Sequence, residues 1–224
     1  MNSPGLLGFM FDMDGVIIDS EPLYQRGEER LFSDYGAVVP AEDWALFKGS
    51  SEEAFYQMAV ERYGISEEWQ DFRDLGRRYV LAEFDRSLSF MPGALDLLKR
   101  LSNQFHLGLV TSTPGDIFAF VDRKLGIARH FEQVIWNGMA PRGKPDPAPY
   151  LLCADRMAVD PRRCVVVEDS IHGVNAGLAA GAQVVTLLGS VPEHLLPAGS
   201  VIINHLDELT PSLVMELNSS VHCH

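Results

Sequence analysis

The chain has 224 residues, of which 46% are hydrophobic and 22% are charged, a balance typical of a folded globular protein. Its net charge of −13 disfavours a polyanionic partner, so we expect no nucleic acid among its ligands. No apolar stretch approaches the roughly 20 residues of a membrane-spanning helix, and an acid interrupts the first apolar run too early for a secretory signal. We therefore expect a cytoplasmic protein without a membrane partner, in which Cys153, Cys164 and Cys223 stay reduced.

Five short apolar runs, each followed by polar residues or glycine, predict the strands of a sheet. They are residues 6–11, 107–110, 133–136, 165–167 and 184–188. Between the later runs, apolar or small residues recur at helical spacing, in 95–101, 117–125, 151–157 and 176–180. Strands that alternate with helices predict an α/β fold with a doubly wound parallel sheet, which binds its ligands at the carboxyl ends of the strands.

Residues 19–87 differ from the rest because they show no strand pattern. Apolar residues at helical spacing predict three helices there, around Leu23–Tyr35, Phe55–Ala59 and Trp69–Tyr79. We expect a catalytic α/β core from residues 1–18 and 88–215, a helical insert from residues 19–87, and a C-terminal tail at residues 216–224 that is poorly ordered at its end. His222, Cys223 and His224 could bind a metal, but a frayed terminus is the expectation.

Two carboxylates, Asp12 and Asp14, follow the first apolar run. At the carboxyl end of a buried strand they could hold a hard cation and take part in phosphoryl transfer. The alternative is a solvated turn at the end of the strand, because aspartate and glycine are common turn residues. The Asp-x-Asp-Gly segment by itself does not decide between these two interpretations.

Three further segments supply groups that phosphate chemistry requires. Thr111 and Ser112 could bind phosphate oxygens or cap a following helix. Lys144 is a compact cation suited to a phosphoryl group, whereas the ordinary alternative is a surface lysine. Glu168 and Asp169 end the fourth apolar run, where they could ligate a divalent cation or cap the next helix. Oxygen ligands favour Mg²⁺, which we expect as the cofactor.

In this order, the four segments resemble the motifs of the haloacid dehalogenase superfamily of aspartyl phosphotransferases. The closest resemblance is to its β-phosphoglucomutase-like phosphatases and mutases, and it runs from about residue 7 to about residue 189. It implies a small helical cap on the α/β core. It also implies a small phosphorylated metabolite as substrate, in particular a sugar or polyol phosphate. We expect a monomer or a weak homodimer.

Each motif residue has an expected role. Asp12 is the nucleophile that forms an aspartyl phosphate, although it could instead only ligate metal. Asp14 is the general acid and base, and the resemblance implies that its main-chain carbonyl binds the metal. Thr111 by its hydroxyl and Ser112 by its main-chain N–H bind the phosphate together with Lys144. The expected metal ligands are Asp12, Asp14, Glu168 and Asp169.

Six residues of the insert are candidates for substrate specificity: Tyr24, Lys48, Gly49, Glu52, Arg77 and Arg78. The resembled mutases hold the distal phosphate of their substrate with an arginine where this chain has Glu52. Pro114 and Gly115 replace a lysine and an asparagine that help to bind that phosphate. These changes favour a hydrolase over a β-phosphoglucomutase-type mutase, which is the alternative. A third hypothesis is a non-catalytic receiver-type module, against which the helical insert and Asp14 both argue.

Overall fold

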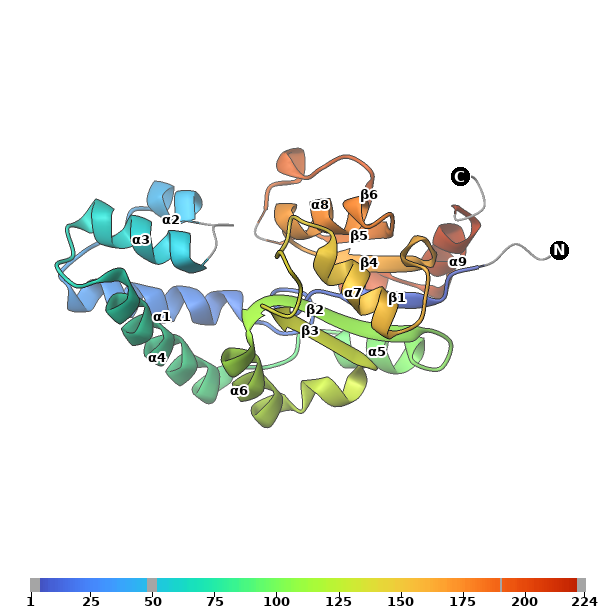
Figure 1. Cartoon of the computed structure of the whole chain (residues 1–224), viewed down its shortest axis with the longest axis horizontal. Coiled ribbons are helices and arrows are strands. Elements are labelled where there is room, and N and C mark those ends of the chain that lie inside the picture. Colours follow the sequence, from blue (N-terminus) through green and yellow to red (C-terminus); the bar gives the residue numbers. More distant parts are fainter. Residues whose placement is uncertain (1–4, 48–51, 190, 221–224) are drawn as a thin grey trace. The chain divides into compact units, whose positions relative to one another are not determined.

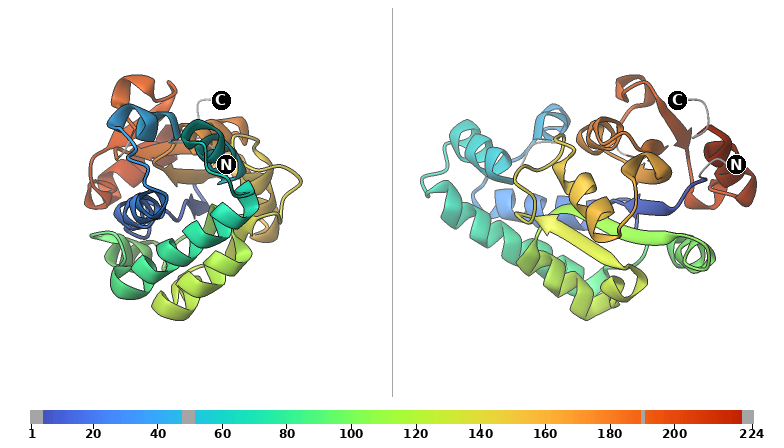
Figure 2. Two further views of the ribbon diagram at one scale, coloured as in Figure 1. Left: turned by 90° about the vertical axis from the view of Figure 1, so that its left-hand side faces the viewer. Right: turned by 45° about the vertical axis from the view of Figure 1, so that its right-hand side comes forward.

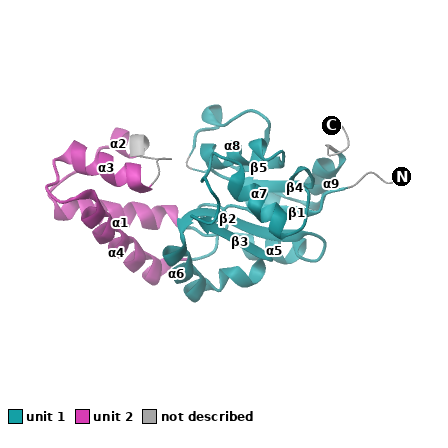
Figure 3. Ribbon diagram, viewed as in Figure 1, with its two compact units in different colours: residues 1–19, 89–224 teal, residues 20–88 magenta. Residues whose placement is uncertain are grey.

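The computed structural model describes residues 5–47, 52–189 and 191–220. The chain forms two compact units, which Figure 3 shows in different colours. Unit 1 combines residues 1–19 with residues 89–224, and unit 2 is residues 20–88. The expected bounds of the insert, 19–87, differ from those of unit 2 by one residue at each end.

Unit 1 contains a parallel sheet with the strand order β3-β2-β1-β4-β5-β6. The strands are β1 (Gly8–Phe11), β2 (His106–Pro114), β3 (Gln133–Asn137), β4 (Cys164–Glu168), β5 (Gln183–Leu187) and β6 (Ser200–Ile203). The predicted doubly wound parallel sheet is confirmed. The sequence did not reveal β6, because this short edge strand leaves Val201 and Ile202 exposed and so lacks a buried pattern.

Helices cover both faces of the sheet (Figures 1 and 2). One face packs on α7 (Ala148–Arg156) and α8 (Ile171–Ala179). The other carries α5 (Ala94–Leu101) and α6 (Gly115–Leu125). All four residues of β1 are buried, because this strand lies in the middle of the sheet between β2 and β4. Burial on both faces explains why the first apolar run is continuous rather than alternating.

The first residues of the expected C-terminal tail, 216–224, belong to a helix. Helix α9 (Pro211–Ser220) continues to Ser220 and buries Leu217. The side chain of Asn218 accepts a hydrogen bond of 2.6 Å from the Leu6 N–H, which ties this helix to the start of β1. The His222-Cys223-His224 segment lies outside the described residues. No helix among the described residues is long and apolar enough to cross a membrane.

In its described part, unit 2 is helical, with α1 (Glu21–Asp34), α2 (Ala41–Phe47), α3 (Glu52–Tyr63) and α4 (Trp69–Ser87). Its centre is aromatic: Phe32 makes edge-to-face contacts with Trp44, Phe55 and Phe72, at centroid distances of 5.7–6.3 Å. Helix α2 was not predicted, since its seven residues are too few for a clear helical period.

The two connections to unit 2 pair with each other inside unit 1. The Asp19 N–H donates a hydrogen bond of 3.0 Å to the Ser89 carbonyl, and the Met91 N–H donates one of 2.9 Å to the Ile17 carbonyl. Between them, Ile18 and Phe90 form an antiparallel bridge. The chain therefore leaves unit 1 and returns to it at neighbouring points.

Candidate active site

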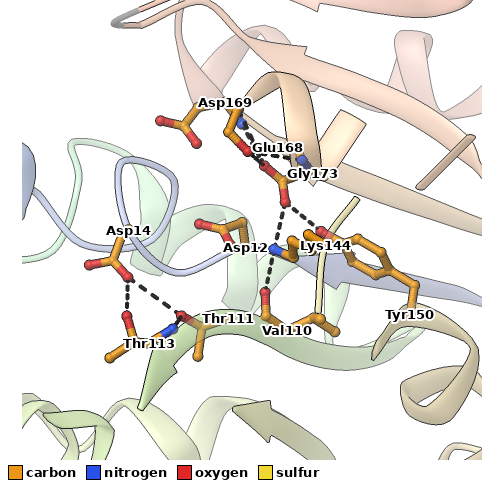
Figure 4. Close-up of polar contacts among 11 residues, drawn as sticks. Asp12, Asp14, Val110, Thr111, Thr113, Lys144, Tyr150, Glu168, Asp169 and Gly173 are labelled. Atoms are coloured by element: carbon orange, nitrogen blue, oxygen red, sulfur yellow. Dashed lines mark hydrogen bonds and ion pairs between the residues drawn. The ribbon is translucent and has the colours of Figure 1, made fainter. Parts of the chain in front are cut away.

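The carboxyl ends of β1, β2 and β4 lie next to each other because β1 pairs with both other strands. Phe11 is in register with Leu109 of β2 and with Val167 of β4. The Asp12 N–H continues this ladder by donating a hydrogen bond of 2.9 Å to the Val167 carbonyl. Three of the four motifs thus meet at one edge of the sheet, as Figure 4 shows. This is where open α/β sheets bind their ligands.

Asp12, Glu168 and Asp169 form a buried acidic cluster. Each offers a carboxylate oxygen, and these oxygens lie within 4.8 Å of one another. Like charges at this separation repel, so a cation is needed to stabilise them all in ionised form. A solvated turn is therefore the wrong interpretation of Asp12, which is only 8% exposed. An all-oxygen donor set of this kind fits a hard divalent cation.

Gly15 allows Asp169 to approach the Asp12–Asp14 segment. Its φ of +75° lies in the left-handed region that glycine adopts readily. A Cβ atom at this position would also be within 2.5 Å of Asp169 Oδ2. The glycine that follows the two aspartates is therefore required both by the backbone turn and by the nearby carboxylate.

Lys144 is buried at the centre of the site and is not a surface lysine. Its side chain is 4% exposed. The ammonium Nζ donates hydrogen bonds to Asp12 Oδ1 at 2.5 Å, to Glu168 Oε1 at 2.6 Å and to the Val110 carbonyl at 2.8 Å. Lys144 therefore links the ends of β1, β2 and β4 and supplies positive charge beside the candidate nucleophile.

Glu168 is held by more partners than the sequence indicated. Besides Lys144, its Oε1 accepts a hydrogen bond of 2.7 Å from the Tyr150 hydroxyl, and its Oε2 accepts one of 3.0 Å from Ser170 Oγ. A Cβ atom on Gly173 would overlap with the Glu168 carboxyl group, so only glycine fits at this position near the start of α8. The site thus fixes Glu168 from several sides.

Sequence reasoning missed Tyr150 and Gly173 as site residues. Tyr150 lies inside an apolar helical segment and looks like a core residue, and Gly173 looks like one of several small packing residues. The capping alternative for the two acids is also wrong, because the cap of α8 is Ser170, whose side chain accepts a hydrogen bond from the Gly173 N–H.

The Asp14 carboxylate turns toward β2 (Figure 4). Its Oδ2 accepts a hydrogen bond of 2.7 Å from Thr113 Oγ1 and a longer one of 3.4 Å from Thr111 Oγ1. Thr111 and Ser112 lie within β2, so they do not cap α6, whose N-cap position is Pro114. The Ser112 side chain is exposed, whereas Thr111 is buried. Thr113 is a third residue that the sequence did not single out.

Burial and neighbouring charges both shift the pKa values of Asp12 and Lys144. Burial raises the pKa of Asp12 to about 8; Lys144 acts against this shift, whereas Glu168 and Asp14 add to it. Burial lowers the pKa of Lys144, but Asp12 and Glu168 outweigh it and leave that pKa above its usual value. Lys144 is therefore protonated at neutral pH. The carboxylates favour further positive charge near them.

The candidate specificity residues belong to unit 2, where the structure describes four of the six. Lys48 and Gly49 lie outside the described residues. Arg77 and Glu52 form a bidentate ion pair, with Nε–Oε1 and Nη2–Oε2 distances of 2.7 and 2.6 Å. The remaining two differ in environment: Tyr24 packs edge-to-face on Phe84, and Arg78 is exposed.

Comparison with known proteins identifies the class that this fold and site define. Residues 9–187 match the model of the haloacid dehalogenase-like hydrolases, and the chain belongs to that family. A Thermotoga maritima phosphorylated carbohydrates phosphatase is 30% identical over 89% of this chain and 94% of its own length. Hexitol phosphatase A of Escherichia coli is 29% identical over 91% of this chain and 93% of its own length.

A solved structure gives the same result. A Thermotoga maritima protein assigned to the β-phosphoglucomutases has a TM-score of 0.78 and 30% identity, and the alignment covers 93% of this chain and 98% of that one. The predicted place among the β-phosphoglucomutase-like phosphatases is thereby confirmed, and the chain is a phosphoric monoester hydrolase.

Proposed function

We propose that the protein hydrolyses a sugar or polyol phosphate by a Mg²⁺-dependent reaction through an aspartyl phosphate on Asp12. The observation that carries this proposal is the contact between Lys144 Nζ and Asp12 Oδ1 inside the buried acidic cluster. A carboxylate held beside a buried ammonium, at the edge of the sheet where ligands bind, is suited to attack a phosphorus atom.

The reaction has two steps. In the first, an Asp12 oxygen forms a bond to phosphorus while the ester oxygen leaves and takes a proton from Asp14. In the second, Asp14 removes a proton from water, which attacks the aspartyl phosphate and releases inorganic phosphate and Asp12. Lys144 stabilises charge on the transferred group, and the Thr111 hydroxyl and the Ser112 N–H bind its oxygens.

Asp12, Asp169 and the main-chain carbonyl of Asp14 are the groups that would hold Mg²⁺. When bound, Mg²⁺ would supply the positive charge that the clustered carboxylates and the phosphate require. Glu168 offers an oxygen to the same cluster, but its hydrogen bonds from Lys144, Tyr150 and Ser170 support a second role in orienting Lys144.

Two observations support a sugar or polyol phosphate as substrate and hydrolysis as the outcome. The relatives include a phosphorylated carbohydrates phosphatase and a hexitol phosphatase. Within unit 2, Glu52 stands where the resembled mutases have an arginine for the second phosphate, and it forms an ion pair with Arg77. An acid at this position favours a substrate with one phosphate and a neutral polyol part.

The test is a screen of hexose, pentose and hexitol monophosphates for release of inorganic phosphate. β-Glucose 1-phosphate is included, together with Mg²⁺ and a catalytic amount of glucose 1,6-bisphosphate. We expect phosphate release from at least one sugar or polyol phosphate and little glucose 6-phosphate. If glucose 6-phosphate accumulates much faster than phosphate, phosphate transfer between sugars is the main reaction and the proposed hydrolysis of a sugar or polyol phosphate is wrong.

A further inference from the structure

We propose that Thr113 is a positioning residue, whose hydroxyl orients Asp14 for proton transfer to the leaving group. The inference rests on the proposed function, in which Asp14 is the general acid. Thr113 Oγ1 donates a hydrogen bond of 2.7 Å to Asp14 Oδ2, and both residues belong to unit 1. A hydroxyl that donates to Oδ2 directs the acidic proton of Asp14 to Oδ1.

Thr113 and Thr111 do not contribute equally to this contact. They lie two residues apart on β2, so both side chains point to the same face of the strand. The Thr111 hydroxyl donates a hydrogen bond of 3.4 Å to Asp14 Oδ2, which is long and therefore weak, and its oxygen also accepts a hydrogen bond of 3.0 Å from the Thr113 N–H. The shorter contact, at 2.7 Å to a carboxylate, is the stronger one.

The local backbone provides the geometry for this contact. The pairing of β2 with β3 shifts register between Val110 and Pro114, the segment that contains Thr113. Irregularities of this kind re-aim side chains near functional sites. Thr113 is only 6% exposed, so its hydroxyl is shielded from the water that would otherwise compete for Asp14.

The role predicts a dependence on the leaving group. A sugar alkoxide is strongly basic and must be protonated as it leaves, whereas p-nitrophenolate is a weak base that leaves without help. The ratio kcat/KM reports the steps up to formation of the phosphoenzyme, where Asp14 acts as an acid. A loss of positioning should therefore lower kcat/KM for a sugar or polyol phosphate more than for p-nitrophenyl phosphate.

The experiment uses the full-length protein with Thr113→Val, which removes the hydroxyl and keeps the branched shape, and Thr113→Ser, which keeps the hydroxyl. For the sugar or polyol phosphate that the wild type hydrolyses, we expect Thr113→Val to lower kcat/KM about 10–100-fold, a part of the total effect of a general acid. For p-nitrophenyl phosphate we expect a loss below about 3-fold, and Thr113→Ser should restore most of the activity.

Thr111→Val is the matched control, because it removes a neighbouring hydroxyl that is proposed to bind the phosphate common to both substrates. It should lower kcat/KM for both substrates alike. In an Asp14→Asn background, Thr113→Val should cause no further loss, since the residue that it positions is already inactive. Thr113→Ala serves as a second hydroxyl-free variant if the valine variant does not fold.

Three results would overturn the inference. Equal losses for both substrates in Thr113→Val, or an additive loss in the Asp14→Asn background, would show that Thr113 is only structural. In that case the wild type still hydrolyses its sugar phosphate, and the proposed function stands. A wild type that hydrolyses p-nitrophenyl phosphate but no sugar or polyol phosphate would overturn the proposed function and this inference with it.

Discussion

The two units differ in what their interiors are made of. At the carboxyl ends of its strands, unit 1 buries a lysine among carboxylates. The interior of unit 2 is built from aromatic rings around Phe32. Its buried carboxylates Asp43 and Glu83 pair with arginines that are exposed. Buried charges contribute little to stability compared with apolar packing. A lysine that is itself buried among carboxylates therefore fits a chemical role for unit 1, whereas the aromatic interior of unit 2 fits a structural or recognition role.

The largest expected effect compares a buried aspartate of each unit. Asp12→Asn keeps the shape of the side chain and removes the nucleophile, so phosphate release should fall by about 10⁴-fold or more. Asp43→Asn in unit 2 removes a carboxylate that accepts hydrogen bonds from Arg62 and Tyr63, and should lower the melting temperature without abolishing turnover. Assays of phosphate release and thermal melts are carried out on both variants. Substantial activity in pure Asp12→Asn protein would exclude the covalent mechanism.

Removal of divalent metal should act on unit 1 alone. With EDTA in excess we expect turnover to fall at least ~10²-fold, because Asp12 and Asp169 would lose the cation that balances them, and Mg²⁺ should restore it. Circular dichroism should show that the helix content of the protein is unchanged. Full activity after exhaustive chelation would contradict the assignment of these carboxylates as ligands.

Replacing one glycine in each unit by alanine should also give different results: a loss of activity in unit 1 and a loss of stability in unit 2. Gly173→Ala places a methyl group where the Glu168 carboxylate lies, so it should disturb Lys144 and lower kcat by about 10–100-fold. Gly27→Ala in α1 places a methyl group 2.8 Å from the backbone nitrogen of Val80 in α4. Overpacking of this kind should lower the free energy of unfolding by about 1–3 kcal/mol. Turnover of p-nitrophenyl phosphate and urea denaturation distinguish the two effects. Equal loss of kcat in both variants would contradict the division of roles.

The smallest expected effect concerns a carboxyl group of unit 2. Burial, reinforced by Glu29, raises the pKa of Glu28 to about 8 from an ordinary value of 4.5. Between these two values the folded protein holds a proton that the unfolded chain has lost, so the free energy of unfolding falls as pH rises. Glu28→Gln mimics the protonated group. It should therefore stabilise the protein by about 1–3 kcal/mol at pH 8 and hardly at all at pH 4.5.

Tryptophan fluorescence in urea suits this measurement, because Trp44 and Trp69 lie in unit 2 and Trp136 lies in unit 1. Glu61→Gln is the control, since Glu61 is exposed, and it should change stability by less than about 0.5 kcal/mol at either pH. A Glu28→Gln effect that does not depend on pH would show that the carboxyl group titrates normally.

The sequence could predict those parts of the fold and site that leave a local pattern, and it could not predict those that depend on tertiary packing. A continuous apolar run followed by an acid is a strong signal, so the strands that carry Asp12 and Glu168 and the α/β class could be predicted. Tyr150 gave no such signal, because a hydroxyl that reaches a carboxylate of another element depends on tertiary packing. Helix α2 was missed since its seven residues are too few for a helical period, and strand β6 since it is short and only partly buried.

The paired connections at Asp19 and Ser89 suggest how enzymes of this kind can diversify. The chain leaves and re-enters unit 1 at residues that are hydrogen-bonded to each other. The segment inserted between them can therefore vary in length and fold while the sheet stays the same. An unrelated segment could be grafted at this junction while Asp12 and Lys144 keep their places. Selection can therefore exchange one insert for another and acquire new substrates without rebuilding the catalytic machinery.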